Sequence, residues 1–356
     1  MRAIPRVSRR RPSVPASGWL AAGSAAAALL LPAPYILEGP GPAIDVLGEH
    51  AGHPVMTVDG GAQDPGEGRL DMTTVLVSGP PGGTTTAAEV VAALADPTTD
   101  AVPRELVHPT GVSAEEVGRA NEAAMTSSQD VATVAALRSL GRDVPGELTV
   151  QAFAPESPAA GVLREGDAVL RAGGEPVRSV DDVRTAVEAA APGPVALTVR
   201  REGREQDLEV PVAAAPAGSE RAWQIGVLMD ERFEVPVEVD FALEDVGGPS
   251  AGTVFALAVI ERLTPGALTG GAHVAVTGTV TADGRVGAIG GLPQKVRGAA
   301  DAGATAFLAP AENCAELVGR VPEGIDVYAV DTLDTARRAL EALGRGQTPD
   351  GVPPCG

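Results

Sequence analysis

Apolar residues recur at helical spacing directly after a loop of small residues in the last third of the chain. The loop is Gly247-Gly248-Pro249-Ser250-Ala251-Gly252, and Thr264-Pro265-Gly266 ends the periodic stretch. The apolar positions between them are Val254, Phe255, Ala258, Val259 and Leu263. The pattern predicts a helix that begins beside Ser250, where unpaired backbone N–H groups point outward and favour negative charge.

The remaining patterns predict an α+β fold. Apolar runs predict strands at 55–58, 70–77, 225–228, 235–239, 273–276, 305–308 and 326–330. Helical spacing predicts helices at 114–140, 293–302, 313–319 and 333–343. Residues 143–214 differ in character, with strands predicted at 148–153 and 195–201, a Gly173-Gly174 turn and a helix at 180–190. This segment therefore reads as a small domain of its own.

The N-terminal pattern is uniformly apolar. Residues 18–37 contain no charge, five arginines precede them, and the first acidic residue is Glu38. Twenty uncharged residues can span a bilayer, and a basic flank favours a cytoplasmic N-terminus. We therefore expect a cytoplasmic basic tail at 1–17, a transmembrane anchor at 18–37 and a stiff linker at 38–49, with the rest outside the cytoplasm. A cleaved signal peptide, which shares the basic start, is the alternative.

Composition narrows the function. The formal net charge of −20 argues against a nucleic-acid partner. Four histidines, at 50, 53, 108 and 273, do not have metal-ligand spacing, so we expect neither a metal site nor a cofactor. Because Cys355 lies in a proline-containing tail, we expect it to stay unpaired with Cys314, and we expect residues 345–356 to be disordered.

Lys295 stands out because it is the only lysine in a chain with 27 basic residues. An ammonium loses its proton when it is buried, whereas a guanidinium in effect does not. Pro293 reads as the start of a helix, so Lys295 falls in its first turn, where the helix dipole disfavours a cation. A neutral lysine beside Ser250 would act as a general base for a serine nucleophile.

Two alternative roles also suit Ser250. Serine is common as a helix N-cap, which would give it a purely structural role. A glycine- and serine-containing loop at a helix N-terminus also suits a small-molecule kinase or another phosphate-binding enzyme. The sequence contains no Gly-x-x-x-x-Gly-Lys-Ser/Thr motif, since its single lysine lies elsewhere, so we expect no ATP at such a site.

Several motifs together resemble the proteolytic domain of the Lon proteases. They are Gly-Gly-Pro-Ser-Ala-Gly at 247–252, Val-Thr-Gly-Thr-Val at 276–280, the Gly-Arg-Val-Gly-Ala-Ile-Gly-Gly-Leu-Pro-Gln-Lys run at 284–295 and Ala-Pro-Ala-Glu-Asn at 309–313. The resemblance implies Ser250 as nucleophile, Lys295 as base and Thr277 as the hydroxyl that supports the lysine. It also implies a hexamer. Gly247 and Thr279 depart from the family's usual Asp and Glu, which puts regulation of the site in doubt.

Backbone N–H groups of the serine loop would hold the oxyanion of a peptide carbonyl under attack. The loop residues assigned to this role are Gly248, Pro249, Ser250 and Ala251.

Residues 143–214 resemble a PDZ domain of the bacterial protease type, through Ser157-Pro158-Ala159-Ala160-Gly161 and Glu165-Gly166-Asp167. A PDZ domain binds an extended peptide at a sheet edge. The predicted groove residues are Leu148, Val150, Phe153, Val183 and Val187. Because strand patterns like those at the start of the Lon domain precede this segment, we expect the PDZ domain to be inserted between 50–142 and 222–344, with placement before the Lon domain as the alternative.

The sequence therefore predicts a membrane-anchored, ATP-independent Ser–Lys endopeptidase. It would act on polypeptides outside the cytoplasm, in protein quality control or processing. The alternative is a proteolytically inert PDZ scaffold on a Lon-like fold.

Overall fold

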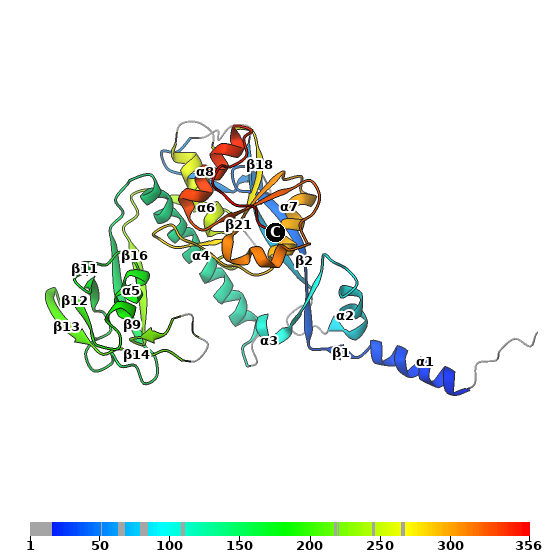
Figure 1. Cartoon of the computed structure of the whole chain (residues 1–356), viewed down its shortest axis with the longest axis horizontal. Helices are drawn as coiled ribbons and strands as arrows, with labels where there is room; N and C mark the ends of the chain where they lie inside the picture. The colour runs from blue at the N-terminus through cyan, green and yellow to red at the C-terminus, as the bar shows by residue number, and fades with distance from the viewer. Residues whose placement is uncertain are drawn as a thin grey trace, which may run out of the picture.

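The computed structural model describes residues 16–50, 52–62, 68–78, 85–107, 111–216, 219, 221–243, 246–264 and 268–356. Within these residues, two six-stranded sheets form the cores of two separate bodies, which we call the larger and the smaller domain (Figure 1).

The larger domain is built on a sheet with the strand order β22-β21-β18-β6-β2-β8. Strands β6, β18, β21 and β22 run parallel, whereas β2 is antiparallel to both β6 and β8. In chain order they are β2 (Tyr35–Asp45), β6 (Arg69–Ser78), β8 (Asp100–Pro103), β18 (His273–Val276), β21 (Ala306–Pro310) and β22 (Asp326–Val330). The sheet of the larger domain thus combines three strands that precede the smaller domain in the sequence with three that follow it.

Helices cover both faces of this sheet. Successive residues of a strand point to opposite faces, so its apolar side chains need a cover on each side. Val274 and Val276 pack with α4 (Ala114–Ser139), α6 (Gly252–Leu263) and α8 (Leu333–Gly344). Ala275, between them, packs with α7 (Leu292–Asp301) and the 3-10 helix η1 (Ala311–Leu317) on the other face. Helix α6 is buried along almost its whole length, as its nearly uniform apolar sequence requires.

The smaller domain has the strand order β13-β12-β10-β9-β16, with α5 (Val180–Ala190) packed on it. Its strands are β9 (Gly146–Phe153), β10 (Ala168–Ala172), β11 (Glu175–Pro176), β12 (Val195–Arg201), β13 (Arg204–Val210) and β16 (Val227–Phe233). The expected end at residue 214 and the assignment of 225–228 to the larger domain are therefore wrong. Ile225 and Val227 join the core of the smaller domain because β16 pairs with β9 along its length.

Short elements complete the fold. The helices are α1 (Ala16–Leu29), α2 (Ala87–Ala93) and α3 (Arg104–Val107). The strands, all in two-stranded pairs, are β1 (Pro32–Ala33) with β7 (Thr85–Thr86), β3 (Glu49–His50) with β4 (His53–Pro54), β5 (Met56–Val58) with β17 (Val239–Phe241), β14 (Ala213–Ala214) with β15 (Trp223–Gln224), and β19 (Thr279–Val280) with β20 (Val286–Gly287).

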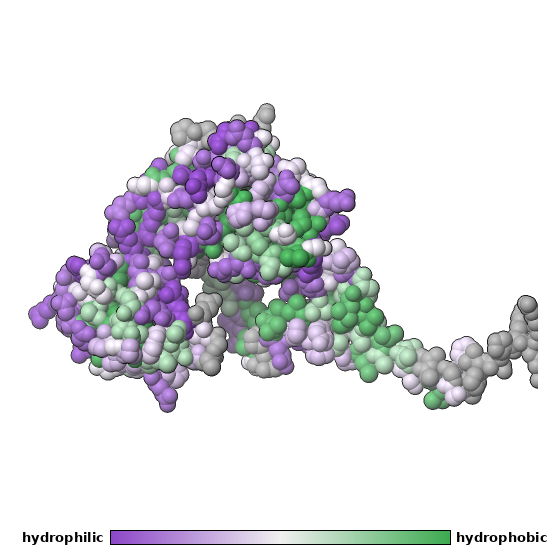
Figure 2. Space-filling model, viewed as in Figure 1, coloured by the Kyte–Doolittle hydropathy of each residue, from purple (hydrophilic) through white to green (hydrophobic). Residues whose placement is uncertain are grey.

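The uncharged N-terminal stretch is divided among three elements, α1, β1 and the start of β2. Helix α1 ends at Leu29 and projects away from the body, while β2 begins at Tyr35 inside the larger sheet. In the part of the chain that the structure describes, no helix has the length and apolar character needed to cross a membrane. Figure 2 shows apolar residues gathered over α1 and α2. The basic tail at 1–17 falls almost wholly outside the described residues.

The expected linker at 38–49 is wrong, because Gly39-Pro40-Gly41-Pro42 lies within β2. This strand pairs with β6 and β8. A Cβ on Gly298 of α7 would lie 2.5 Å from the carbonyl oxygen of Gly41, and a Cβ on Gly41 would collide with Thr74 of β6. The glycines therefore serve close packing in the core rather than a spacer between domains.

The C-terminal tail is ordered, and the expectations of a disordered tail and unpaired cysteines are both wrong. Cys355 forms a disulfide with Cys314 of η1, and its backbone N–H donates to the oxygen of Val327 over 2.9 Å. Val352 and Cys355 are buried. A tail without regular periodicity is held by these few contacts, which pattern analysis does not detect.

Candidate active site

Ser250 lies in a loop that two other segments hold in place. Gly248 N–H donates to the oxygen of Asn121 over 2.9 Å, and Ser128 Oγ donates to the oxygen of Pro249 over 3.1 Å, so α4 supports the loop from one side. From the other side, Gly278 N–H donates to Ser250 O over 2.9 Å. The N-cap of α6 is Ala251, without a side-chain cap. The hydroxyl of Ser250 is therefore free of the capping role that would have given it a structural purpose.

Lys295 Nζ lies 2.7 Å from Ser250 Oγ and 3.2 Å from Thr277 Oγ1. Thr277 Oγ1 in turn donates to the backbone oxygen of Ser250 over 3.1 Å. Lys295 is only 3% exposed, and this burial lowers its pKa from 10.5 to about 8. The three predicted residues thus come together, and the amine is poised to lose its proton at mildly alkaline pH.

The approach of Lys295 depends on the start of α7. Gly291 is its N-cap, with a φ of +69° that favours glycine. A Cβ at this position would lie 2.6 Å from Val75 Cγ2 of β6, so a side chain would also collide with the sheet. The helix begins at Leu292, one residue before Pro293, and Lys295 lies in its first turn as expected.

Asn313 is a site residue to which sequence reasoning gave no role. Its Oδ1 accepts from Ile289 N–H and its Nδ2 donates to Ile289 O, each over 2.9 Å. Asn313 therefore fixes the backbone just before α7 by binding both the N–H and the carbonyl of Ile289. The Ala-Pro-Ala-Glu-Asn motif marks this position in the sequence, but only the fold shows what the amide binds.

A cleft of about 550 Å³ opens at Ser250 and Lys295. One wall is the end of β6, from Thr73 to Val77, and Gly247, Gly290 and Met125 contribute to the other walls. Among the residues that the structure describes, β6 pairs only with β2 beyond Met72, because its pairing with β18 stops there. The edge of β6 that faces away from β2 is thus unpaired beside the serine.

The serine loop offers a restricted set of oxyanion donors. Pro249 has no N–H, and Gly248 N–H is already bonded to Asn121. Within the four residues assigned to this role, the N–H groups of Ser250 and Ala251 remain as donors. No group of three or more His, Cys, Asp or Glu side chains that could hold a metal occurs among the described residues.

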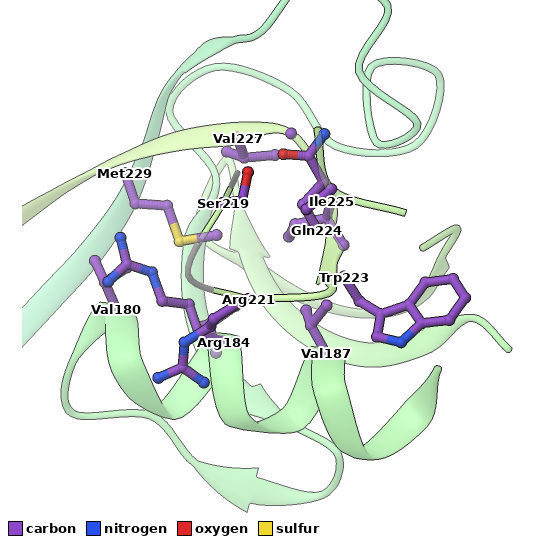
Figure 3. A pocket seen from close by; sticks show the side chains of 13 residues that line it. Val180, Arg184, Val187, Ser219, Arg221, Trp223, Gln224, Ile225, Val227 and Met229 are labelled. Carbon is purple, nitrogen blue, oxygen red and sulfur yellow. The ribbon is translucent and has the colours of Figure 1, made fainter. Parts of the chain in front are cut away.

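The peptide groove of the smaller domain lies one strand further out than predicted. Strand β9 is paired on both sides, and Leu148 and Val150 are buried in the core, so the groove cannot run along this strand. Phe153, at its end, is only partly buried against that core. Instead, a groove of about 330 Å³ lies between α5 and the edge strand β16 (Figure 3). Val183 and Val187 do line it.

Two protein families match parts of this chain. Residues 229–341 match the Lon protease (S16) C-terminal proteolytic domain, and residues 116–212 match the PDZ domain. The first match contains Ser250, Thr277, Lys295 and Asn313. The second begins inside α4, and the sheet of the smaller domain continues beyond its end to β16.

Curated relatives with similar sequences are Lon proteases. Lon protease 1 of Sorangium cellulosum (strain So ce56) is 35% identical over 129 residues, which are 35% of this chain and 16% of the relative. Lon protease 1 of Bacillus subtilis (strain 168) is 35% identical over 116 residues, 31% of this chain and 15% of the relative. The Lon protease of Clostridioides difficile (strain 630) is 44% identical over 78 residues, 22% and 10% of the two chains. The chain thus spans less than a fifth of these relatives.

Among solved structures, the PDZ domain of the SdrC-like protein from Listeria innocua aligns with 23% of this chain and 92% of its own, at 18% identity and a TM-score of 0.21.

Proposed function

Because the chain carries the proteolytic domain of the Lon proteases, which are serine peptidases, together with a PDZ domain, we propose that it is a serine endopeptidase with a Ser250–Lys295 dyad. The observation that carries this proposal is the 2.7 Å contact between Lys295 Nζ and Ser250 Oγ, made by an amine whose pKa burial lowers to about 8.

In the proposed reaction, neutral Lys295 accepts the Ser250 proton while Oγ attacks a peptide carbonyl. Thr277 Oγ1 accepts one lysine N–H, which directs the nitrogen lone pair toward the serine. The N–H groups of Ser250 and Ala251 stabilise the oxyanion, and one such donor typically contributes ~10²–10³ in rate. The lysine then gives its proton to the leaving amine. A water molecule, deprotonated by the same lysine, releases the acyl group and restores the serine.

The unpaired edge of β6 supports a polypeptide as the substrate. An extended peptide can add to this edge through backbone hydrogen bonds, in the manner of strand addition. Leu76 and Val77 are exposed on the same stretch and would contact its side chains. Backbone recognition of this kind does not need a chain end, which favours an endopeptidase.

We further propose that the chain is anchored in the cell membrane by its N-terminal segment, with the catalytic domain outside the cytoplasm. The arginine-rich start and uncharged 18–37 stretch support the orientation. Exposed Leu30 and Leu31 after α1, and Val91 and Leu94 around α2, support contact with lipid (Figure 2). The Cys314–Cys355 disulfide supports an oxidising compartment.

In this proposal the PDZ domain recognises peptide or protein substrates, and the enzyme works in protein quality control or processing. The resemblance to Lon supports a homo-hexamer. We propose that hydrolysis does not require ATP, because no step of the Ser250–Lys295 reaction uses a nucleotide.

The test is hydrolysis of unstructured, internally quenched polypeptides by the full-length protein without nucleotide. Lys295→Arg keeps the positive charge but should reduce kcat to the level of Ser250→Ala, because a guanidinium stays protonated. Arg297→Lys, an exposed cation in the same helix, is the matched control and should retain activity. For the wild type, kcat/KM should rise with pH through about 8. A wild type as inactive as Ser250→Ala, or an active Lys295→Arg, would refute the dyad.

Location is tested separately in cells without an outer wall barrier. External protease should digest the catalytic domain and spare the N-terminus. Recovery of a soluble protein that starts at or after Leu37 would instead show a cleaved signal peptide.

A further inference from the structure

Most residues that line the groove between α5 and β16 are apolar, and the polar ones are Ser219, Gln224 and two arginines. Among the described residues that line it, Arg184 and Arg221 are the charged ones, and no carboxylate is present. Figure 3 shows both guanidinium groups toward the end marked by Val180 and Met229, with Trp223 at the other end. Their side chains are 61% and 33% exposed, so a bound chain would meet them.

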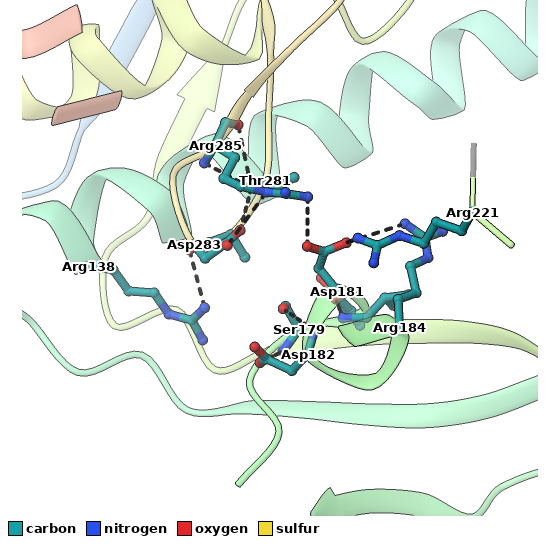
Figure 4. Close-up of polar contacts among 12 residues, drawn as sticks. Arg138, Ser179, Asp181, Asp182, Arg184, Arg221, Thr281, Asp283 and Arg285 are labelled. Carbon is teal, nitrogen blue, oxygen red and sulfur yellow. Dashed lines mark hydrogen bonds and ion pairs between the residues drawn. The ribbon is translucent and has the colours of Figure 1, made fainter. Parts of the chain in front are cut away.

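These two arginines share one carboxylate with an arginine of the protease domain. Arg221 Nη2 lies 2.7 Å from Asp181 Oδ1, and Arg184 Nη1 lies 3.9 Å from the same oxygen. Arg285 Nη2 forms an ion pair with Asp181 Oδ2 at 2.7 Å. Figure 4 shows the guanidinium groups of Arg221 and Arg285 on opposite sides of Asp181. Asp283, 4.0 Å from Arg285, is a further carboxylate at this cluster, but it lies on the protease side.

Among the described residues, Asp181 is the one carboxylate within 4.0 Å of Arg184 or Arg221. Asp181 is only 17% exposed and divides its two oxygens among three cations, which repel one another. A second carboxylate placed in the groove would neutralise Arg184 and Arg221 and reduce this repulsion. The groove therefore lacks an anionic partner that an apolar peptide with one acidic side chain can provide.

We propose that the PDZ groove selects extended peptides that carry an acidic side chain, with Arg184 and Arg221 as the residues that determine this specificity. The proposal rests on the peptide-binding role assigned to the PDZ domain above. It adds a class of ligand, apolar and acidic, to a groove that would otherwise select on apolar side chains alone.

The same geometry couples the groove to the protease domain. When the ligand carboxylate engages Arg221, Asp181 keeps Arg285 with less competition, so the interdomain ion pair is strengthened. Arg285 stands in the turn between β19 and β20. That hairpin follows Thr277 directly and leads on to Gly290, which lines the catalytic cleft. By thermodynamic reciprocity, loss of Arg285 must weaken binding of acidic peptides.

The experiment uses full-length protein with Ser250→Ala, which prevents cleavage of the probe. The probes are fluorescein-labelled octapeptides of Val and Ala in which a single Glu is moved through each position, with a matching Gln series. In fluorescence anisotropy, one Glu position should bind about fivefold tighter than its Gln counterpart at low salt. Arg221→Gln and Arg184→Gln should each reduce that preference to less than twofold while leaving Gln peptides unaffected. Arg204→Gln, on the opposite edge strand β13, is the control and should preserve it.

Coupling is measured with Arg285→Gln, which should weaken the preferred Glu peptide about twofold and leave the Gln peptide unchanged. Equal binding of Glu and Gln peptides at every position would refute the acidic specificity while leaving peptide binding by the PDZ domain intact. Absence of binding by either series would contradict the PDZ part of the proposed function itself. An unchanged Glu preference in Arg285→Gln would refute the coupling.

Discussion

Replacement of Lys295 by methionine should stabilise the protein at neutral pH while it abolishes hydrolysis. Burial lowers the lysine pKa in the folded state from 10.5 to about 8. The unfolded chain keeps the ordinary value, so it binds more protons than the folded chain between these two pKa values. Stability of the wild type therefore rises with pH across that window. Below pH 8 the folded state bears the whole cost of a buried ammonium.

The magnitude follows from the two pKa values. The difference between 10.5 and about 8 corresponds to a cost of ~3 kcal/mol at pH 7, which falls to ~1 kcal/mol at pH 9.5. Methionine has a similar length and no charge, so Lys295→Met removes this cost. It also loses the contacts with Ser250 and Thr277, which opposes the gain by about 1–2 kcal/mol. The stability gap between variant and wild type should thus shrink by about 2 kcal/mol from pH 7 to pH 9.5.

The assay is urea unfolding followed by circular dichroism at both pH values, with the difference taken between variant and wild type. Contributions from the smaller domain cancel in this difference. Arg297→Met removes an exposed cation from the same helix and should show no pH-dependent gap, because its ion pair with Asp301 lies in solvent. A gap for Lys295→Met that is the same at both pH values would refute a depressed lysine pKa, and with it the physical basis for a neutral base.

Three further predictions concern residues that support the dyad. Thr277→Val should lower kcat/KM about 10- to 100-fold, because the lysine loses its orienting hydroxyl, whereas Thr277→Ser should retain most activity; equal loss in both would point to packing instead. Asn313→Ala should leave the partly buried backbone of Ile289 without its side-chain partner, which costs about 1–2 kcal/mol. We expect kcat to fall while KM changes little, and unchanged kinetics would contradict the clamp. Cys355→Ser removes a disulfide between residues 41 apart and should reduce the free energy of unfolding by up to about 4 kcal/mol. In thermal unfolding, reductant should lower the midpoint of the wild type and leave that of the variant unchanged. Equal midpoints for the two proteins without reductant would contradict this prediction.

The contact between Ser250 and Lys295 could be predicted because each residue carries a local signal. Ser250 stands in a loop of small residues before an apolar helix, and Lys295 is the single lysine in the chain, in the first turn of its own helix. Both helices form where periodicity placed them, α6 from Gly252 and α7 from Leu292. Local pattern, composition and motif order were therefore enough to predict the residues of the candidate site. Helix starts and glycine-rich turns depend on neighbouring residues, which the sequence shows directly.

Only the tertiary structure determined which distant segments meet. The pairing of β16 with β9 moved the peptide groove outward and brought Arg221 beside Asp181, 40 residues away in sequence. The same holds for the disulfide of Cys355 and for Asn313, whose amide binds a backbone 24 residues earlier. Such contacts depend on strand order and on which buried polar groups still lack partners once the core has formed. Sequence periodicity fixes which face of an element is buried, but it contains no information on which partner covers that face.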